Sequence, residues 1–340
     1  MSDDPRPAPE AGADDPVPEG IPAPAHPTQR REPLPWTRPK PDVEDPGAQA
    51  RVQAILASPT YRQADQDVDF LNTAATRGVR LQLDYFKPQT CLEQAGVQHT
   101  IVVFGSTRIP EPAAARRRLA EARAALAQAP DDAELRRRVQ VAERIVAKSR
   151  YYEEARRFGQ LVGRSGMGPA DSRLVLMTGG GPGMMEAANR GAFDVGAKTV
   201  GLNITLPHEQ YPNPYLTPEL TFRFHYFAIR KLHFLLRARA LVVFPGGYGT
   251  LDELFEVLTL VQTRKIRPLP IVLVGRDYWQ RLIDFDLLVA EGTIDPEDAE
   301  LFWYAEQAEE IWEGIQAWYR RAGRPLINGM GPPADDAEPA

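Results

Sequence analysis

The chain has little cysteine, no long apolar run and no excess of positive charge. Cys91 is its one cysteine in 340 residues, so no disulfide can form within the chain and a cysteine-rich metal site is excluded. No uncharged apolar run approaches the ~20 residues of a membrane-spanning helix, and the N-terminus has no basic segment followed by an apolar one. The formal net charge of -6 argues against a protein that coats nucleic acid or a membrane surface. We therefore expect a cytoplasmic protein that binds small molecules.

The two ends of the chain differ in composition from the part between them. Residues 1–46 are rich in proline, aspartate, glutamate and alanine, and 326–340 end in "GPPADDAEPA". Such segments bury too little apolar surface to offset the entropy lost on ordering, so we predict two disordered tails. Within residues 47–98, Val68, Leu71, Ala75 and Val79 recur at helical spacing, which predicts an N-terminal helical extension.

Short apolar runs alternate with helical patterns from residue 99 to residue 325. The runs are "HTIVVF", "RLVLM", "TVGLN", "LTFRFH", "ALVVF" and "LPIVLV". This alternation predicts an α/β protein, a doubly wound parallel sheet with helices on both faces. Residues 111–150 interrupt the pattern, and their mixed Arg, Glu and Ala content with a break at "APDD" predicts an inserted helical hairpin with solvent-exposed charged faces.

Two glycine-rich turns follow predicted strands, "TGGGPGMMEA" from Thr178 and "FPGGYGTLDELFE" from Phe244. Glycines let the backbone approach a ligand, and the free N–H groups of the following helix favour an anion. Neither turn has the lysine of a triphosphate-binding loop, and neither has the G-x-G-x-x-G spacing of a dinucleotide site. The turns therefore favour a monophosphate ligand.

The sequence allows a structural and a functional interpretation for each of the charged residues Glu253, Arg230 and Lys231. If Thr250 caps the helix, Glu253 completes a T-x-x-E capping box; the same carboxylate also lies where a nucleotide would continue beyond its phosphate. Arg230 and Lys231 form either an ordinary surface pair or a pair that reaches the cleft at the strand ends. No metal site, no Ser-His-Asp arrangement and no lysine in a pyridoxal-phosphate motif is evident.

Taken together, "GGGPGMMEAANRGA", the pair at Arg230 and Lys231, and "PGGYGTLDE" resemble the LOG family, once described as lysine decarboxylases. The signature P-G-G-x-G-T-x-x-E is matched in full. The resemblance implies a Rossmann-like domain over 99–325 and a nucleoside 5'-monophosphate phosphoribohydrolase, an N-glycosidase that releases the base and ribose 5-phosphate. It also implies a homodimer or higher homo-oligomer and no cofactor. The extra helices and the "GGGPGMMEA" turn are more similar to the longer bacterial nucleotide nucleosidases than to the short plant-like members.

The same resemblance implies roles for individual residues. Arg230 and Glu253 are the expected catalytic residues. The expected substrate-binding residues are Gly105, Ser106, Gly179, Gly180, Gly181, Met184, Lys231, Gly246, Gly247, Tyr248, Gly249 and Thr250. The preferred base, AMP-like or of the cytokinin riboside monophosphate type, stays open. The alternative is a non-catalytic binding or carrier protein for a phosphorylated ligand such as molybdenum cofactor, against which the Arg-plus-Glu pair argues.

Overall fold

The computed structural model describes residues 20, 22, 25–30, 32–34, 39–207 and 211–327. The predicted tails, 1–46 and 326–340, fall largely outside these residues, and there they stay predictions. The chain divides after Leu71 into two compact units, which we describe separately. Within the described residues, no helix has both the length and the apolar character that a membrane crossing requires.

The first unit contains three short helical segments with little buried surface: α1 (Ala48–Leu56), η2 (Pro59–Tyr61) and α2 (Val68–Leu71). Ala48 is buried in α1, and neither η2 nor α2 buries a residue. The helical spacing that begins at Val68 is interrupted, because α2 ends at Leu71 and the next helix begins at Arg77. The intervening "NTAAT" contains Asn and Thr, whose side chains compete with helical hydrogen bonds and favour helix ends.

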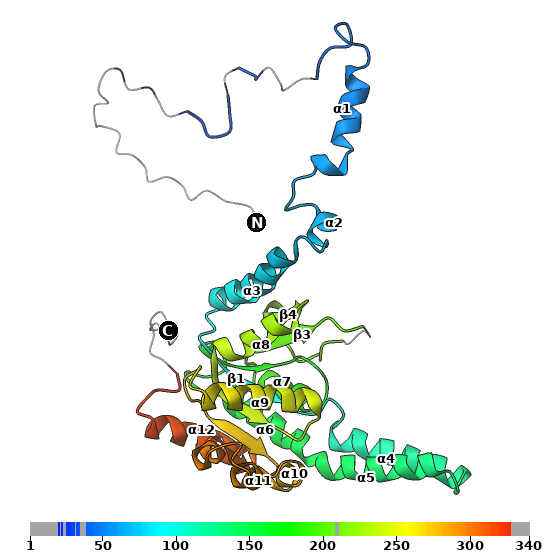
Figure 1. Ribbon diagram of the computed structural model, residues 1–340, viewed down its shortest axis with the longest axis vertical. Helices are drawn as coiled ribbons and strands as arrows, with labels where there is room; N and C mark the ends of the chain where they lie inside the picture. Colours follow the sequence, from blue (N-terminus) through cyan, green and yellow to red (C-terminus); the bar gives the residue numbers. More distant parts are fainter. Residues whose placement is uncertain are drawn as a thin grey trace. The chain divides into compact units, whose positions relative to one another are not determined.

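A seven-stranded, all-parallel sheet forms the centre of the second unit (Figure 1). Its strands are β1 (His99–Phe104), β2 (Leu174–Thr178), β3 (Thr199–Ile204), β4 (Thr221–Phe224), β5 (Ala238–Val243), β6 (Ile271–Val274) and β7 (Trp303–Ala305). The order is β4-β3-β2-β1-β5-β6-β7, so the chain moves outward from β1 in one direction and then returns to continue from β5 in the other. The predicted α/β class is confirmed. The sequence prediction missed β7, which is only three residues long and ends the apolar stretch "LFWYA".

Helices cover both faces of this sheet, as predicted. They are α3 (Arg77–Gln94), α6 (Arg150–Gly163), α7 (Met184–Asp194), α8 (Phe227–Leu236), α9 (Tyr248–Gln262), α10 (Arg276–Leu282), α11 (Phe285–Ala290) and α12 (Ala308–Arg321), with η3 (Pro218–Leu220) and η4 (Pro296–Glu300) in the connections. Ile101 and Val103 of β1 pack in one core with α6, α7 and α12. Val102 and Phe104 pack in the other core with α3, α8 and α9. Successive strand residues thus serve opposite faces, which explains the continuous apolar runs.

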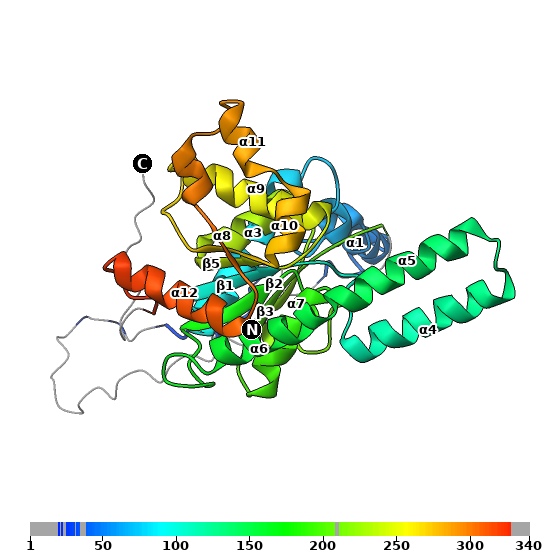
Figure 2. The ribbon, with the colours of Figure 1, turned by 90° about the horizontal axis from the view of Figure 1, so that it is seen from below.

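The predicted hairpin is present as α4 (Pro112–Gln128) and α5 (Ala133–Lys148). Figures 1 and 2 show the two helices side by side, projecting from the sheet. Asp132 caps α5, since its carboxylate accepts hydrogen bonds from the amides of Glu134 at 2.8 Å and Leu135 at 3.0 Å. The hairpin buries only Ala114, Ala115 and Val139, in keeping with its charged composition.

Two glycines let α6 and α7 approach each other to backbone contact. A Cβ atom on Gly191 would lie 1.8 Å from the carbonyl oxygen of Arg156, and one on Gly159 would lie 2.2 Å from that of Ala188. No side chain fits at either position without moving a helix. Because α7 begins at the first glycine-rich turn, this close packing also sets the position of that turn.

We expect Gly191→Ala to lower the free energy of unfolding by at least ~2 kcal/mol, because the added methyl group meets fixed backbone. Gly78→Ala is the control, since Gly78 lies exposed in α3 with no atom within 4 Å of the added Cβ. That variant should be neutral or stabilised by up to ~1 kcal/mol. Urea unfolding followed by circular dichroism measures both. Equal stability of the two variants would contradict the packing described.

Candidate active site

A pocket of about 500 Å³ lies at the carboxyl ends of β1 and β5. Its wall consists of residues 104–108 after β1, Met185 on α7, Phe227 and Arg230 on α8, and residues 247–250, 252 and 253 at the start of α9. The strand order changes direction between β1 and β5, and open α/β sheets bind ligands at such a switch point. The second glycine-rich turn and the predicted catalytic pair therefore meet where the topology favours a site.

The loop after β1 joins the two glycine-rich turns. The amide of Ser106 donates to the carbonyl of Pro245 at 2.9 Å, and the Ser106 carbonyl accepts from the amide of Met184 at 3.1 Å. A Cβ atom on Gly105 would lie 2.6 Å from the Met184 Cβ atom, so only glycine fits there. Both predicted loop residues, Gly105 and Ser106, line the pocket and also hold the turns together.

The first glycine-rich turn forms a buried support behind the pocket. Gly180 has a φ of +70°, and a Cβ atom there would lie 2.2 Å from Oδ1 of Asn203. Asn213 ties the turn to the loop after β3: its amide donates to the Gly180 carbonyl at 2.9 Å and its side chain donates to the Gly181 carbonyl at 3.1 Å. Gly179, Gly180 and Gly181 are buried and do not line the pocket.

Met184 belongs to the same support. Its side chain is fully buried in the core shared with α6, whereas the neighbouring Met185 lines the pocket. The sequence predicted that Met184 contacts the substrate. In the structure Met185, the next residue of α7, lines the pocket instead.

Arg230 reaches the cleft rather than the outer surface of α8. Its Nε donates to the carbonyl of Leu202 at 2.7 Å. A Cβ atom on Gly179 would lie 2.6 Å from an Nη atom of Arg230, so the glycine makes room for the guanidinium group. Burial lowers the pKa of Arg230 and the nearby Glu253 carboxylate opposes that shift. A guanidinium group stays protonated in proteins, so a fixed positive charge lies in the pocket wall.

The capping-box interpretation of Glu253 is wrong. Helix α9 begins at Tyr248 with Gly247 as its N-cap, three residues before the N-cap that the motif suggests, and no side chain caps it. Thr250 is therefore the third helical residue and Glu253 lies in the second turn. The Glu253 side chain is 7% exposed, which leaves a carboxylate buried at the pocket.

Burial raises the pKa of Glu253 to about 7, while Lys231 acts in the opposite direction. The Lys231 Nζ atom lies 3.9 Å from Oε1 of Glu253 and 2.8 Å from the carboxylates of both Asp252 and Glu256. Lys231 was predicted to bind substrate. The structure places it between the carboxylates of α9, outside the residues that line the pocket.

The second glycine-rich turn presents backbone to the pocket. A Cβ atom on Gly246 would lie 2.1 Å from the hydroxyl oxygen of the buried Thr250, and the Gly246 carbonyl accepts from the Tyr278 hydroxyl at 2.5 Å. Gly247, Tyr248 and Gly249 are exposed at the rim. The amides of Thr250 and Leu251 both donate to the Gly247 carbonyl at 3.0 Å, and the start of α9 that precedes them is a positive helix end that favours an anion.

The sequence prediction missed several residues of the pocket wall, namely Phe104, Thr107, Arg108, Met185, Phe227 and Asp252. Each lies within three residues of a predicted position. The sequence motifs therefore identified the right segments. Their spacing did not predict which residues of each turn or helix face the pocket.

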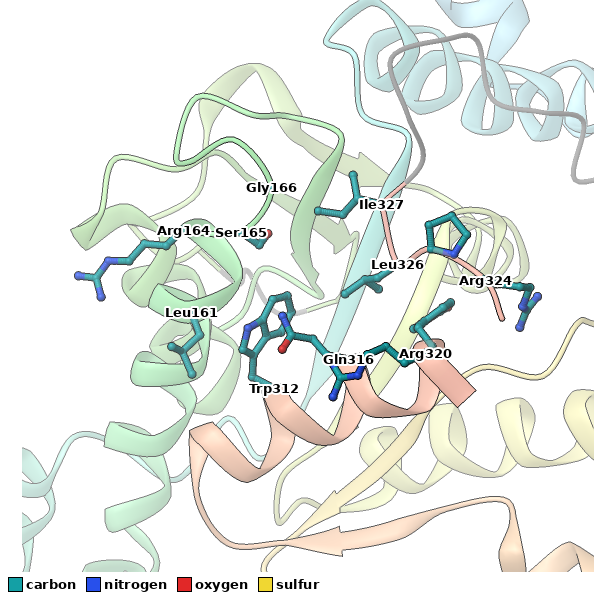
Figure 3. Close-up of a pocket in the computed structure, with 12 residues that line it drawn as sticks. Leu161, Arg164, Ser165, Gly166, Trp312, Gln316, Arg320, Arg324, Leu326 and Ile327 are labelled. Atoms are coloured by element: carbon teal, nitrogen blue, oxygen red, sulfur yellow. The ribbon is translucent and has the colours of Figure 1, made fainter. Parts of the chain in front are cut away.

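A second hollow of about 570 Å³ lies between the ends of α6 and α12 and residues 324–327. Figure 3 shows Trp312, Leu326 and Ile327 gathered around it, whereas the guanidinium groups of Arg164 and Arg324 extend away. It lies near the amino ends of the strands, because α6 leads into β2, and no predicted site residue lines it. We therefore take the pocket at the carboxyl ends as the candidate active site.

Parts of the chain are similar to known proteins. A family model described as possible lysine decarboxylase matches residues 185–315. Cytokinin riboside 5'-monophosphate phosphoribohydrolase LOG3 of Arabidopsis thaliana is 32% identical over 178 residues, which are 50% of this chain and 77% of that protein. The probable enzyme LOGL3 of Oryza sativa subsp. japonica is 30% identical over 156 residues, 42% of this chain and 68% of that protein.

A solved structure of the Moco carrier protein from Chlamydomonas reinhardtii superposes with a TM-score of 0.38 at 18% identity. The superposition covers 66% of this chain and 99% of that chain. The score is too low to carry an argument about function.

The parallel sheet and the glycine-rich pocket at its switch point define an α/β protein of the Rossmann-like class. With its full P-G-G-x-G-T-x-x-E motif and the similarity above, the chain belongs to the LOG family.

The raised pKa of Glu253 makes stability depend on pH. The folded protein keeps this proton up to about pH 7, whereas the unfolded chain releases it near 4.5, so the carboxyl destabilises the fold as pH rises through this window. Glu253→Gln should therefore raise the free energy of unfolding by up to about 3 kcal/mol near pH 8 and change it little near pH 4.5.

Urea unfolding at the two pH values measures this difference, and Glu313→Gln on the exposed side of α12 is the control. A stabilisation by Glu253→Gln that is the same at both pH values would show that the carboxyl is not held protonated by burial.

Proposed function

We propose that this protein hydrolyses the N-glycosidic bond of nucleoside 5'-monophosphates and releases the free base and ribose 5-phosphate. The observation that carries the proposal is the placement of Arg230 and Glu253, both largely buried, beside the N-terminus of α9 in one pocket. An anion-binding backbone and a charged pair next to it suit a substrate with a phosphate at one end and a reacting bond a few ångströms away.

The reaction requires a group that acts on water near neutral pH. Water attacks C1' of the ribose, the C–N bond breaks, and the departing base takes the bonding electrons and, overall, the proton that the attacking water gives up. Positive charge develops on the ribose ring in the transition state, which an ionised Glu253 stabilises while it accepts the proton of the attacking water. A pKa near 7 matches this role, because the carboxylate is then both available and basic enough.

Arg230 acts on the other side of the bond. Negative charge develops on the departing base, and a guanidinium group fixed on the Leu202 carbonyl stabilises that charge without reorganisation. The amides of Gly247, Tyr248 and Gly249 hold the phosphate, so binding energy far from the C–N bond positions it for attack.

The proposed substrates are nucleoside 5'-monophosphates with a range of bases rather than one named base. The plant relatives are named as cytokinin riboside 5'-monophosphate phosphoribohydrolases. We propose AMP and cytokinin riboside monophosphates as the first substrates to compare. The homodimer implied by the family resemblance stays a prediction; Phe227, Leu232 and Leu236 of α8, between 39% and 50% exposed, are apolar surface available to such an interface.

Purified protein incubated with a panel of nucleoside monophosphates, nucleosides and bases tests the function. We expect one or more monophosphates to yield free base and ribose 5-phosphate, separated by chromatography. Glu253→Gln should lower kcat by about 10²–10⁴-fold, the usual contribution of a general acid or base. Glu313→Gln should leave kcat unchanged, because that carboxylate lies on α12 outside the pocket.

The outcome also separates the enzyme from the carrier alternative. If no member of the panel is cleaved while a phosphorylated ligand binds tightly, the pocket serves binding alone. Equal turnover by the wild type and Glu253→Gln would remove Glu253 from the chemistry.

A further inference from the structure

The pocket has three cations in or beside its wall, and two of them are already engaged. Lys231 is held by Asp252 and Glu256 at 2.8 Å each. Arg230 donates to the Leu202 carbonyl and lies against Gly179. The third is Arg108, which lines the pocket and is exposed. Among the ion pairs of the described residues, none involves Arg108.

The backbone that carries Arg108 is fixed. Its amide donates to the Ser106 hydroxyl at 3.1 Å, and Ser106 is itself bonded to both glycine-rich turns. A Cβ atom on Gly183 would lie 2.3 Å from the Ser106 carbonyl oxygen and 3.0 Å from the Thr107 Cα atom, so the loop is pressed against the first turn. The following residue, Ile109, is 2% exposed. Arg108 is thus a long cationic side chain on a backbone segment that is held in place at the rim of the pocket.

The charges of the pocket wall do not balance those of a bound phosphate monoester without a further cation. A phosphate monoester carries up to two negative charges, and the first amides of α9 supply only partial positive charge. Asp252 and Glu253 add negative charge to the same wall. A guanidinium group matches phosphate oxygens with two parallel hydrogen bonds, which an amide nest alone does not provide.

We propose that Arg108 binds the phosphate monoester of the substrate together with the N-terminal amides of α9, and thereby selects nucleotides over nucleosides. This inference rests on the proposed function, and it names the residue that recognises the phosphate. Arg108 acts in binding and takes no part in bond cleavage, so it changes KM and the dissociation constant more than kcat.

The test compares ligands with and without the phosphate. Dissociation constants for AMP, adenosine and ribose 5-phosphate are measured by isothermal titration calorimetry for the wild type, Arg108→Gln and Arg108→Lys. Arg116→Gln on α4 is the control, since Arg116 is an exposed arginine outside the pocket. We expect Arg108→Gln to weaken AMP and ribose 5-phosphate binding at least tenfold and to leave adenosine unchanged. Arg108→Lys should lie between the wild type and Arg108→Gln, because lysine keeps the charge and loses the planar fork.

The experiment distinguishes failure of the proposed reaction from failure of the proposed role of Arg108. If the wild type binds AMP and does not cleave it, the proposed reaction is wrong while the affinity ratio of AMP to adenosine still tests Arg108. An unchanged ratio in Arg108→Gln overturns the inference, as does a wild type that binds AMP no more tightly than adenosine. Equal weakening of AMP and adenosine assigns Arg108 a structural role instead.

Discussion

The burial of the Glu253 carboxylate between α8 and α9 is the interaction on which the pocket depends. Taking a carboxylate out of water favours its neutral form, which is why the pKa lies near 7 in spite of two nearby cations. Lys231 offsets that effect only in part, because Asp252 and Glu256 share its charge. The result is a carboxyl group that changes its charge near neutral pH, at a cost in stability, beside a fixed guanidinium group.

Most glycines of the two motifs serve packing rather than ligand contact. Gly179 makes room for Arg230, Gly105 for Met184 and Gly246 for Thr250, and in each case a Cβ atom would come within 2.6 Å of the side chain it now admits. Gly247 and Gly249 differ, since nothing lies within 4 Å of an added Cβ atom and both are exposed at the pocket. The glycines around the pocket are therefore of two kinds: those that make room for a neighbouring side chain, and those that leave the start of α9 exposed.

The sequence predicted the main strands, both glycine-rich turns and the hairpin, because each has a strong local signal in apolar runs, glycine content or charge. It failed where the answer depended on tertiary contacts. The N-cap of α9 at Gly247 rather than Thr250 was hidden by a plausible capping box, which placed Glu253 on the wrong turn of the helix. The pairing of Lys231 with α9 joins residues more than 20 positions apart, and no spacing rule reveals it. Likewise, Met185 rather than Met184 faces the pocket, because the Met184 side chain packs in the core with α6.

The central claim is that Glu253 acts as an ionised carboxylate whose pKa is set by burial. The pH dependence of kcat/KM for a cleaved monophosphate, between about pH 5 and pH 9, tests it most directly because this parameter reports the ionisations of the free enzyme. The account predicts an activity that rises with pH through an apparent pKa near 7. An acid limb near 4.5, the ordinary value for glutamate, would contradict it.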